Sequence, residues 1–306
     1  MILSPLFWPV ELKGKLIYIL DETALPGRLS RIKAGNYRQA CRAIKEMKTR
    51  AVGQVLLVMY TFLLESRRKT DLRKVAEAIN ATRPTLFFKM LTDMVLAWSA
   101  NNASIERNIT GFLEMLKNKR VEQAGQAAKL LKDEDIILTH CNVSGLLPLI
   151  AEFCRREGKN ISFYVTETRP YLQGARLTAW ELNRQGFDVT VICDSAAAAV
   201  LSKGKINKII VGADHLAKNG DIANKVGTYQ LAILGKYFNI PFYVLCPPAS
   251  TVASGKDIKI EIRPEKELLE IEGKRIAPKG VKGYYPAFDI TPNEYITRHI
   301  YLNIHR

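Results

Sequence analysis

Short apolar segments alternate with helical stretches over residues 136–246, and this alternation limits the possible folds more than any other feature. Each segment is short and mostly apolar, and polar residues bound the first one. Such segments are typical of strands in a parallel sheet that is buried on both faces. The predicted strands are 136–139, 161–165, 189–193, 208–213 and 242–246.

Helical stretches separate these segments, near residues 145–157, 173–186, 195–202 and 223–238. A strand, a crossover helix and a parallel strand form a βαβ unit, and repeated units build a sheet with helices on its faces. We therefore predict an α/β fold with a Rossmann-like, doubly wound parallel sheet in the C-terminal half.

The N-terminal half has a different pattern. Residues 10–20 have the features of a small β-hairpin, and apolar residues recur with helical spacing from 36 to 133. This spacing predicts about five helices. The acidic run before the first predicted strand marks the domain boundary. We predict a mostly helical N-terminal domain at 1–134 and an α/β catalytic domain at 135–306.

The composition excludes several classes of protein. Hydrophobic residues make up 47% of the 306 residues, which is too many for a disordered chain. The chain has no run of about 18 apolar residues, and Pro5 and Pro9 interrupt its apolar start, so we predict neither a membrane span nor a signal peptide. The five cysteines are odd in number and form no C-x-x-C pair, which indicates neither a disulfide framework nor a zinc site. We predict a cytoplasmic protein.

The net charge of +15 favours a phosphate-bearing partner: a nucleic acid, an anionic membrane or a phosphorylated metabolite. Both halves of the chain carry an excess of lysine and arginine, so the charge is not gathered into a basic tail. No motif combines stacking aromatics with basic residues, as nucleic-acid modules do. We therefore interpret most of this charge as a solubilising surface, and we rank that interpretation above nucleic-acid binding.

Polar side chains follow the predicted strands at the point where each strand ends. In an open parallel sheet, ligands bind beyond these carboxyl ends. Cys141 is either a general acid or nucleophile there, or a small buried side chain. Asp214 is either catalytic or a turn-capping residue, whereas Asp194 and Ser195 fit a helix N-cap better. We interpret Cys41, Cys154 and Cys193 as core residues.

Several basic residues lie where they could hold an anion. Arg83 and Arg169 each precede a proline, and Lys225 lies near the predicted start of the helix at 223–238. Backbone N–H groups at a helix start bind phosphate, although each of these side chains could equally be a solvated surface residue. Neither G-x-G-x-x-G nor a Walker A motif is present, which disfavours dinucleotide enzymes and nucleoside triphosphatases.

The chain resembles one protein superfamily over nearly its whole length. That superfamily comprises methylthioribose-1-phosphate isomerase, ribose-1,5-bisphosphate isomerase and the regulatory subunits of the initiation factor 2B complex. Two segments, LQGARLTAWEL and NGDIANKVGTYQLA, are most similar to methylthioribose-1-phosphate isomerase. The resemblance is carried by segments 20–26, 43–53, 82–85, 139–142, 166–182, 211–236, 240–244 and 285–292.

The resemblance implies a set of site residues. It implies that Cys141 and Asp214 are the catalytic pair, that no metal or organic cofactor takes part, and that the protein forms a homodimer through the sheet domain. It also implies that the phosphate and the sugar are held by Arg50, Arg83, Gln173, Asn224 and Lys225.

The implied activity is an aldose–ketose isomerisation of a pentose 1-phosphate, with 5-methylthioribose 1-phosphate as the best candidate for this small phosphorylated sugar. Ribose 1,5-bisphosphate is an alternative, although Gln54 and Leu57 replace a lysine and an arginine of the bisphosphate isomerases. A further alternative is a non-catalytic regulatory subunit that binds initiation factor 2. Ala51 stands where the family carries a glycine beside Arg50, which leaves phosphate binding by that loop an open question.

Overall fold

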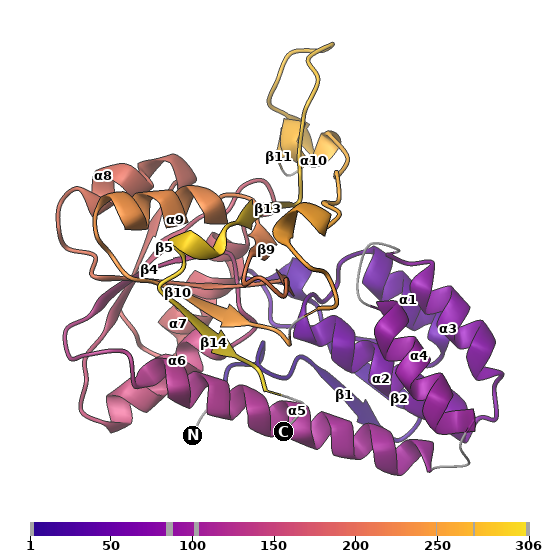
Figure 1. The fold of residues 1–306 in the computed structure, drawn as a ribbon. Coiled ribbons are helices and arrows are strands. Elements are labelled where there is room, and N and C mark those ends of the chain that lie inside the picture. The colour runs from indigo at the N-terminus through magenta and orange to yellow at the C-terminus, as the bar shows by residue number, and fades with distance from the viewer. Residues whose placement is uncertain (1–2, 84–87, 101–103, 249, 272, 304–306) are drawn as a thin grey trace. The chain divides into compact units, whose positions relative to one another are not determined.

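The computed structural model describes residues 3–83, 88–100, 104–248, 250–271 and 273–303 (Figure 1). The chain forms two compact units. One contains Met1–Val121 with Ser144–Leu146, and the other contains Glu122–Val143 with Leu147–Arg306. The division of the chain into these units falls within helix α5 (Ile105–Ala128), whereas the parallel sheet begins at Ile136. A boundary of folding domains at residues 134–135 stays a prediction.

Six parallel strands form the central sheet of the C-terminal unit, in the order β14-β10-β7-β4-β5-β6. The chain builds outward from β4 to β6, then returns to the other side of β4 and builds outward again. This is the predicted doubly wound arrangement. The strands are β4 (Ile136–His140), β5 (Ser162–Thr166), β6 (Val189–Ile192), β7 (Lys208–Gly212), β10 (Phe242–Cys246) and β14 (Arg298–Tyr301).

Helices cover both faces of this sheet, with α8 and α9 on one face and α6 and α7 on the other (Figure 1). Side chains from α8 and α9 join Ile209, Val211 and Phe242 in one buried apolar cluster. Burial of these side chains is the main source of stability for such a layer. The helices are α6 (Leu146–Arg156), α7 (Ala179–Arg184), which follows a π-helical turn at Gly174–Thr178, α8 (Ala197–Leu201) and α9 (Thr228–Tyr237).

A small antiparallel sheet lies beside the parallel one and corrects one prediction. The sequence predicted a helix from residue 223, but Ile222–Lys225 forms strand β9, and α9 begins only at Thr228. Strand β9 pairs with β8 (His215–Leu216) and with β13 (Phe288–Thr291). The pairing partner β13 lies some sixty residues later in the chain. Local propensity therefore gave no sign of the strand.

An arm extends from the C-terminal unit between β10 and β13 (Figure 1). It contains α10 (Lys266–Leu269) and a two-stranded hairpin of β11 (Glu270–Ile271) and β12 (Lys274–Arg275). The sequence analysis predicted neither this hairpin nor the edge strand β14, because their strands are only two to four residues long.

The N-terminal unit combines a small sheet with helices, as predicted. Its hairpin is confirmed, and a third strand that the sequence analysis missed extends it. Helix α2 is buried on nearly all sides, so it lies at the centre of this unit. The elements are β1 (Val10–Lys13), β2 (Leu16–Leu20), β3 (Arg31–Ala34), α1 (Tyr37–Lys45), α2 (Val52–Arg67), α3 (Leu72–Asn80), α4 (Phe88–Ala100) and most of α5.

Gly174 allows the turn before α7 to pack directly against the end of β5. A Cβ atom at this position would lie 1.8 Å from the carbonyl oxygen of Thr166. We expect Gly174→Ala to lower the free energy of unfolding by about 2–3 kcal/mol or more, because an overpacked site forces the backbone to shift. Urea denaturation followed by circular dichroism measures this change.

Gly125 provides the matched control. It also lies in the C-terminal unit, inside a helix, and an added Cβ would meet only the Phe153 ring at an ordinary 3.9 Å. Gly125→Ala should raise the free energy of unfolding by about 0.5–1 kcal/mol, because alanine loses less backbone entropy in a helix. Equal stability of Gly174→Ala and the native chain would contradict the close packing described for the turn.

Candidate active site at the centre of the sheet

The central strands β4 and β7 end side by side at the point where the winding of the sheet reverses. His140 on β4 pairs with Val211 on β7, so Cys141 and Gly212 follow as neighbours. Asp214 comes two residues later on the same edge. The helices diverge from this switch point, and open α/β sheets bind their ligands there. The structure thus brings together the strand ends that carry the predicted catalytic pair.

The backbone of Cys141 is held from two sides. Its N–H donates to Thr168 Oγ1 at 2.9 Å, and its carbonyl accepts from Thr178 Oγ1 at 2.6 Å. The residue is buried, and its φ of 63° lies in the left-handed region that L-residues rarely adopt. Such a conformation persists only where the surroundings fix it, and it concentrates at functional sites. This geometry favours the functional interpretation of Cys141.

The next residue, Asn142, is bound to α7 and the turn before it. Its amide donates to Glu181 Oε1 at 2.8 Å and to Thr178 Oγ1 at 3.0 Å. Thr178 therefore contacts both Cys141 and Asn142, and the loop after β4 is tied to one helix.

His140, the last residue of β4, is a buried and neutral side chain next to Cys141 in the sequence. Its Nε2 lies 2.9 Å from the carbonyl oxygen of Val226, which only accepts, so Nε2 carries the proton. Its Nδ1 then accepts from Thr166 Oγ1 at 2.6 Å. Burial lowers the pKa of His140 to about 4, and the charge on Lys225 acts in the same direction. The imidazole is therefore a fixed neutral group above pH 5.

Asp214 lies half-buried between β7 and β8. Its N–H donates to the carbonyl of Ala223, which places Asp214 beside β9 and close to Asn224. Burial lowers the pKa of the adjacent His215, and the Asp214 charge opposes that shift. The acid–base role of Asp214 stays a prediction.

Asn224 and Lys225 lie on β9, inside the small sheet, and not at a helix start as predicted. Both are buried, and the Asn224 amide donates to Thr228 Oγ1 at 2.9 Å. Lys225 Nζ donates to the carbonyl of Ala287 at 2.8 Å and to Tyr285 Oη at 3.2 Å. The lysine is thus a buried cation with a fixed position, and the interpretation of a solvated surface lysine is wrong.

Gln173 carries a buried acceptor for which the described residues provide no donor. The side chain is 96% buried, and its Oε1 accepts no hydrogen bond from any of them. A buried oxygen without a donor costs about 1–3 kcal/mol, so the native fold rarely retains one without a use. A hydroxyl group of a bound sugar would satisfy it.

Arg50 and Arg83 both belong to the N-terminal unit, around the start of α2. Arg50 Nε donates to Glu22 Oε2 at 3.1 Å, and Arg83 contacts Gln54 Oε1 at 3.5 Å. Ala51 adopts φ 44°, ψ −120°, a conformation that favours glycine, so the loop keeps a glycine-like backbone without a glycine. The two residues after Arg83, Pro84 and Thr85, lie outside the described residues, and so does the predicted helix start.

Two further predictions need correction. Asp194 caps no helix: its carboxylate accepts the backbone N–H groups of Thr168 and Arg169, which lie 26 and 25 residues earlier in the sequence. Cys193 is exposed, so its assignment to the core is wrong, whereas Cys41 and Cys154 are buried. The Arg169 side chain is partly buried and donates to the carbonyls of Pro170 and Leu268.

The sequence analysis missed two residues of the site, Tyr285 and Asp289. Asp289 Oδ2 accepts from Gly227 N at 2.6 Å and Oδ1 accepts from Tyr229 N at 3.2 Å, so it caps α9. Burial raises the pKa of Asp289 to about 6, against the effect of these hydrogen bonds. The segment YPAFDITP was a signal for both residues, but no role followed from their spacing.

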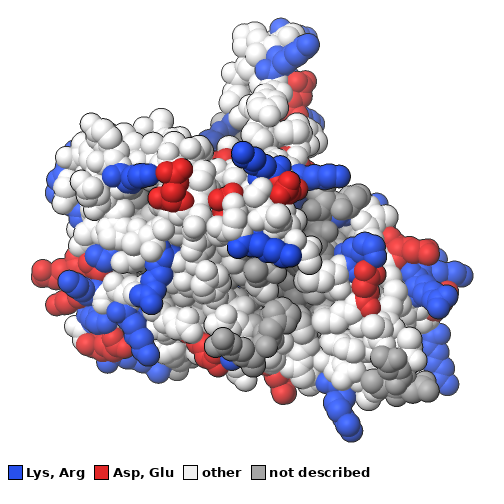
Figure 2. All heavy atoms as spheres, viewed as in Figure 1, with Lys and Arg blue, Asp and Glu red and all other residues white. Residues whose placement is uncertain are grey.

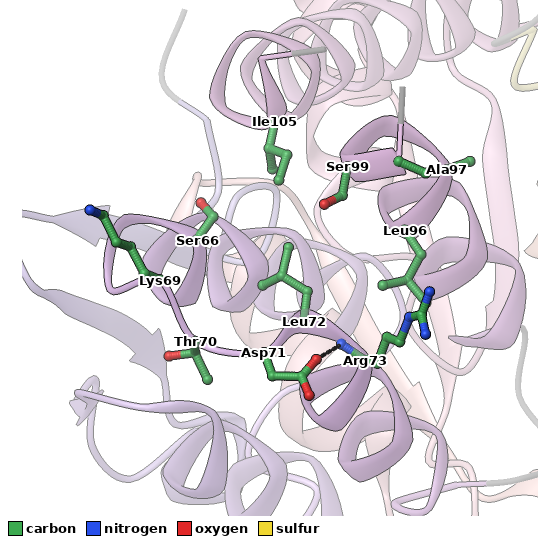
Figure 3. A pocket seen from close by; sticks show the side chains of 11 residues that line it. Ser66, Lys69, Thr70, Asp71, Leu72, Arg73, Leu96, Ala97, Ser99 and Ile105 are labelled. Carbon is green, nitrogen blue, oxygen red and sulfur yellow. Dashed lines mark hydrogen bonds between the residues drawn. The ribbon is translucent and has the colours of Figure 1, made fainter. Parts of the chain in front are cut away.

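A pocket of about 610 Å³ lies in the N-terminal unit, where α2, α3, α4 and α5 meet (Figure 3). Lys69 and Arg73 supply positive charge at its rim, and Leu72, Leu96 and Ile105 supply apolar surface. No predicted site residue lines it, so it is distinct from the arginine cluster at the start of α2.

Lysine and arginine side chains are scattered singly or in small groups over the face shown in Figure 2, with acidic residues among them. This pattern agrees with dispersed surface charge. Within the described residues, no helix is long and apolar enough to cross a membrane. In the same part of the chain, no three His, Cys, Asp or Glu side chains are grouped as metal ligands would be.

Known proteins match the chain over most of its length. The sequence pattern of the Initiation factor 2 subunit family matches residues 35–301. A methylthioribose-1-phosphate isomerase of Acetivibrio thermocellus is 38% identical over 94% of this chain and 93% of its own length. One of Thermotoga petrophila is 38% identical over 94% of this chain and 91% of its own length.

Two solved structures share the fold. A 5-methylthioribose 1-phosphate isomerase from Pyrococcus horikoshii superposes with a TM-score of 0.83 at 32% identity, over 96% of this chain and 90% of its own. The delta subunit of translation initiation factor eIF-2B from A. fulgidus superposes with a TM-score of 0.82 at 33% identity, over 96% and 94%. The fold therefore serves both an isomerase and a subunit named for translation.

The lowered pKa of His140 predicts how stability depends on pH. The unfolded chain takes up a proton below its ordinary pKa of 6.5, whereas the folded chain does so only near pH 4. The stability that neutral His140 contributes to the fold is therefore complete above pH 7, and it is lost as the pH falls from 6.5 towards 4. The gap in unfolding free energy between the native chain and His140→Gln should narrow by roughly 2–3 kcal/mol from pH 7 to pH 4.5.

Urea denaturation at both pH values measures this gap. Asp289 acts in the opposite sense, because its raised pKa adds stability as the pH falls from about 6. It is present in both proteins, so its effect cancels in the comparison. A gap that stays constant with pH would show that His140 is not held neutral.

Proposed function

The chain belongs to the Initiation factor 2 subunit family, and on that premise we propose that it is an aldose–ketose isomerase of a pentose 1-phosphate. The proposed substrate is 5-methylthioribose 1-phosphate, and the product is 5-methylthioribulose 1-phosphate. The positions of Cys141 and Asp214 after two neighbouring strands, at the switch point of the sheet, carry this proposal. The names of the relatives that are 36–38% identical to the chain support the choice of substrate.

The chemistry requires acid–base groups because phosphate blocks the anomeric oxygen, so the sugar cannot open as a free aldose does. Asp214 protonates the ring oxygen while the bond between that oxygen and C1 breaks. A proton leaves C2 and one is added at C1, with Cys141 as the group that exchanges it. The Asp214 carboxylate takes the proton of the C2 hydroxyl as the C2 carbonyl forms, which restores its acid form, so substrate and product are isomers. Each such group typically contributes about 10²–10⁴-fold to the rate.

The remaining residues bind the substrate in this proposal. Lys225 and Asn224 occupy fixed, buried positions on the strand next to Asp214, where a cation and an amide can hold phosphate and sugar oxygens. Gln173 accepts from a sugar hydroxyl through its unsatisfied Oε1. We also propose Arg50 and Arg83 as phosphate ligands. The reaction requires neither a metal ion nor an organic cofactor.

Ribose 1,5-bisphosphate is a weaker candidate substrate. Gln54 stands where bisphosphate isomerases carry a lysine, and its amide donates to the carbonyl of Thr49 at 3.0 Å. Leu57, which stands in place of an arginine, is fully buried. Neither position can hold the second phosphate.

A regulatory subunit that binds initiation factor 2 is the second candidate function. The eIF-2B delta subunit of A. fulgidus resembles this chain as closely as the solved isomerase does, with TM-scores of 0.82 and 0.83. A scaffolding role requires neither a thiol nor a carboxyl at the switch point, whereas the isomerase requires both. Turnover assays therefore separate the two functions.

The assembly and the compartment belong to the same proposal. We place the protein in the cytoplasm because all five of its cysteines are free thiols, which suits a reducing compartment. We propose a homodimer that forms through the sheet domain. Sedimentation or light scattering would show a mass of about twice the 34.4 kDa chain if it is correct.

We expect Cys141→Ser to abolish turnover while leaving substrate binding within a few-fold of the native value. The hydroxyl keeps the size of the side chain but exchanges protons far less readily than a thiol near neutral pH. Turnover of 5-methylthioribose 1-phosphate and ribose 1,5-bisphosphate should be measured side by side, with calorimetry for binding. Conversion of neither sugar by the folded native protein, together with binding of initiation factor 2, would favour the regulatory subunit.

Lys225→Met should raise KM about 10- to 100-fold and change kcat only a few-fold, because the ammonium group holds the phosphate alike in the ground and transition states. Methionine keeps the packing against Phe288, over which Nζ lies 5.1 Å from the ring centroid. Lys218→Met, at an exposed lysine on the turn between β8 and β9, is the matched control. A fall in kcat with an unchanged KM would show that Lys225 does not hold the phosphate of the substrate.

A further inference from the structure

We propose that Asp194 is a positioning residue for Cys141, acting through Thr168. This inference deepens the proposed function and rests on it. Asp194 follows β6, Thr168 follows β5 and Cys141 follows β4, so the contacts run across three neighbouring strand ends. Nothing in the sequence motifs assigns a role to Asp194.

The first link is a pair of short hydrogen bonds to the Asp194 carboxylate. Oδ1 accepts from Thr168 N at 2.8 Å, and Oδ2 accepts from Arg169 N at 2.7 Å. Both carboxylate oxygens are therefore committed to the loop after β5. Hydrogen bonds to an ionised acceptor are shorter and about twice as strong as neutral ones.

The second link is the Thr168 side chain. Its Oγ1 accepts from Cys141 N at 2.9 Å and lies 3.2 Å from the carbonyl oxygen of Thr166, to which it donates. Thr168 is fully buried, so its hydroxyl has one fixed orientation. The hydroxyl thus transmits the position of the loop after β5 to the backbone of Cys141.

Both linked residues adopt a backbone conformation that they would not adopt alone. Thr168 has φ 65° and Cys141 has φ 63°, and neither is glycine. For a β-branched residue such as threonine, this region is a true outlier. The strain persists only if other contacts determine it. The bonds from Thr168 N and Arg169 N to Asp194 are such contacts, together with the bond from Leu172 N to the Thr168 carbonyl.

Placement of the thiol matters because it must reach both C1 and C2 of the sugar. A displacement of about 1 Å at a reacting group can cost about 10²-fold in rate. The substrate contacts proposed for Lys225 and Asn224 lie on β9, which neither of these two links touches. Loss of Asp194 should therefore act on kcat and leave KM nearly unchanged.

The main test is Asp194→Asn, which keeps the shape of the side chain but leaves one acceptor oxygen for two N–H groups. We expect kcat to fall about 10- to 100-fold, with KM within about threefold of the native value. The matched control is Asp221→Asn. Asp221 also accepts two backbone N–H groups, from Gly255 and Asn293, and among the described residues it makes no contact with the loop of Cys141. Asp221→Asn should lower the free energy of unfolding by a similar amount and leave kcat unchanged.

A second readout needs no substrate, so it separates this inference from the proposed function. Iodoacetamide alkylation at Cys141, quantified by peptide mass spectrometry, reports how tightly the loop is held. We expect Asp194→Asn to speed alkylation of Cys141 about tenfold, because local opening becomes easier. Asp221→Asn should match the native rate. If the native protein converts neither sugar, this readout still supports or overturns the positioning role.

Two variants of Thr168 test the proposal if Asp194→Asn folds poorly. Thr168→Val removes the hydroxyl at nearly constant volume, and it should also lower kcat and speed the alkylation of Cys141. Thr168→Ser keeps the hydroxyl, and it should keep the native kcat and the native alkylation rate. In the double variant Asp194→Asn/Thr168→Val, kcat should fall no further than in the worse single variant, because both act through one link. Additive losses of kcat, or native alkylation rates in both single variants, would overturn the proposal.

Discussion

A parallel sheet that is covered on both faces leaves no place for polar chemistry except the ends of its strands. The central strands of this chain are buried nearly completely, and α8 and α9 close one face with apolar side chains. Thiol, carboxyl and amide groups therefore gather where β4, β5, β6 and β7 end. The reversal of winding between β4 and β7 then separates the helices above these two ends. Every part of the candidate site depends on that one reversal.

The site is held mainly by hydrogen bonds between loops. Threonine hydroxyls from the loop after β5 and from the turn before α7 fix the N–H and the carbonyl of Cys141. The Asp194 carboxylate fixes the loop after β5 in turn. Side chains packed this way lose little entropy when a ligand binds, because the fold has already ordered them. The small sheet adds a second rigid wall, in which Lys225 and Asn224 occupy neighbouring positions on one strand.

The same fold serves proteins with different names, so fold similarity alone does not decide the activity. The distinction lies in a few side chains. Retention of a strained cysteine beside an aspartate has no benefit for a scaffold, because left-handed backbone at a non-glycine residue lowers stability. An enzyme that must hold a thiol against a sugar carbon gains from it.

The sequence by itself determined the strands and helices whose apolar pattern is continuous, and it placed Cys141 and Asp214 at strand ends. It also contained the motifs that identify the family. The features that depend on partners distant in sequence became apparent only from the three-dimensional fold. Strand β9 exists because β13 pairs with it, and Asp194 binds a loop that lies 25 residues earlier instead of capping its own helix. Local propensity reports on neighbours within a few residues, whereas these contacts form only after the sheet has brought its strand ends together.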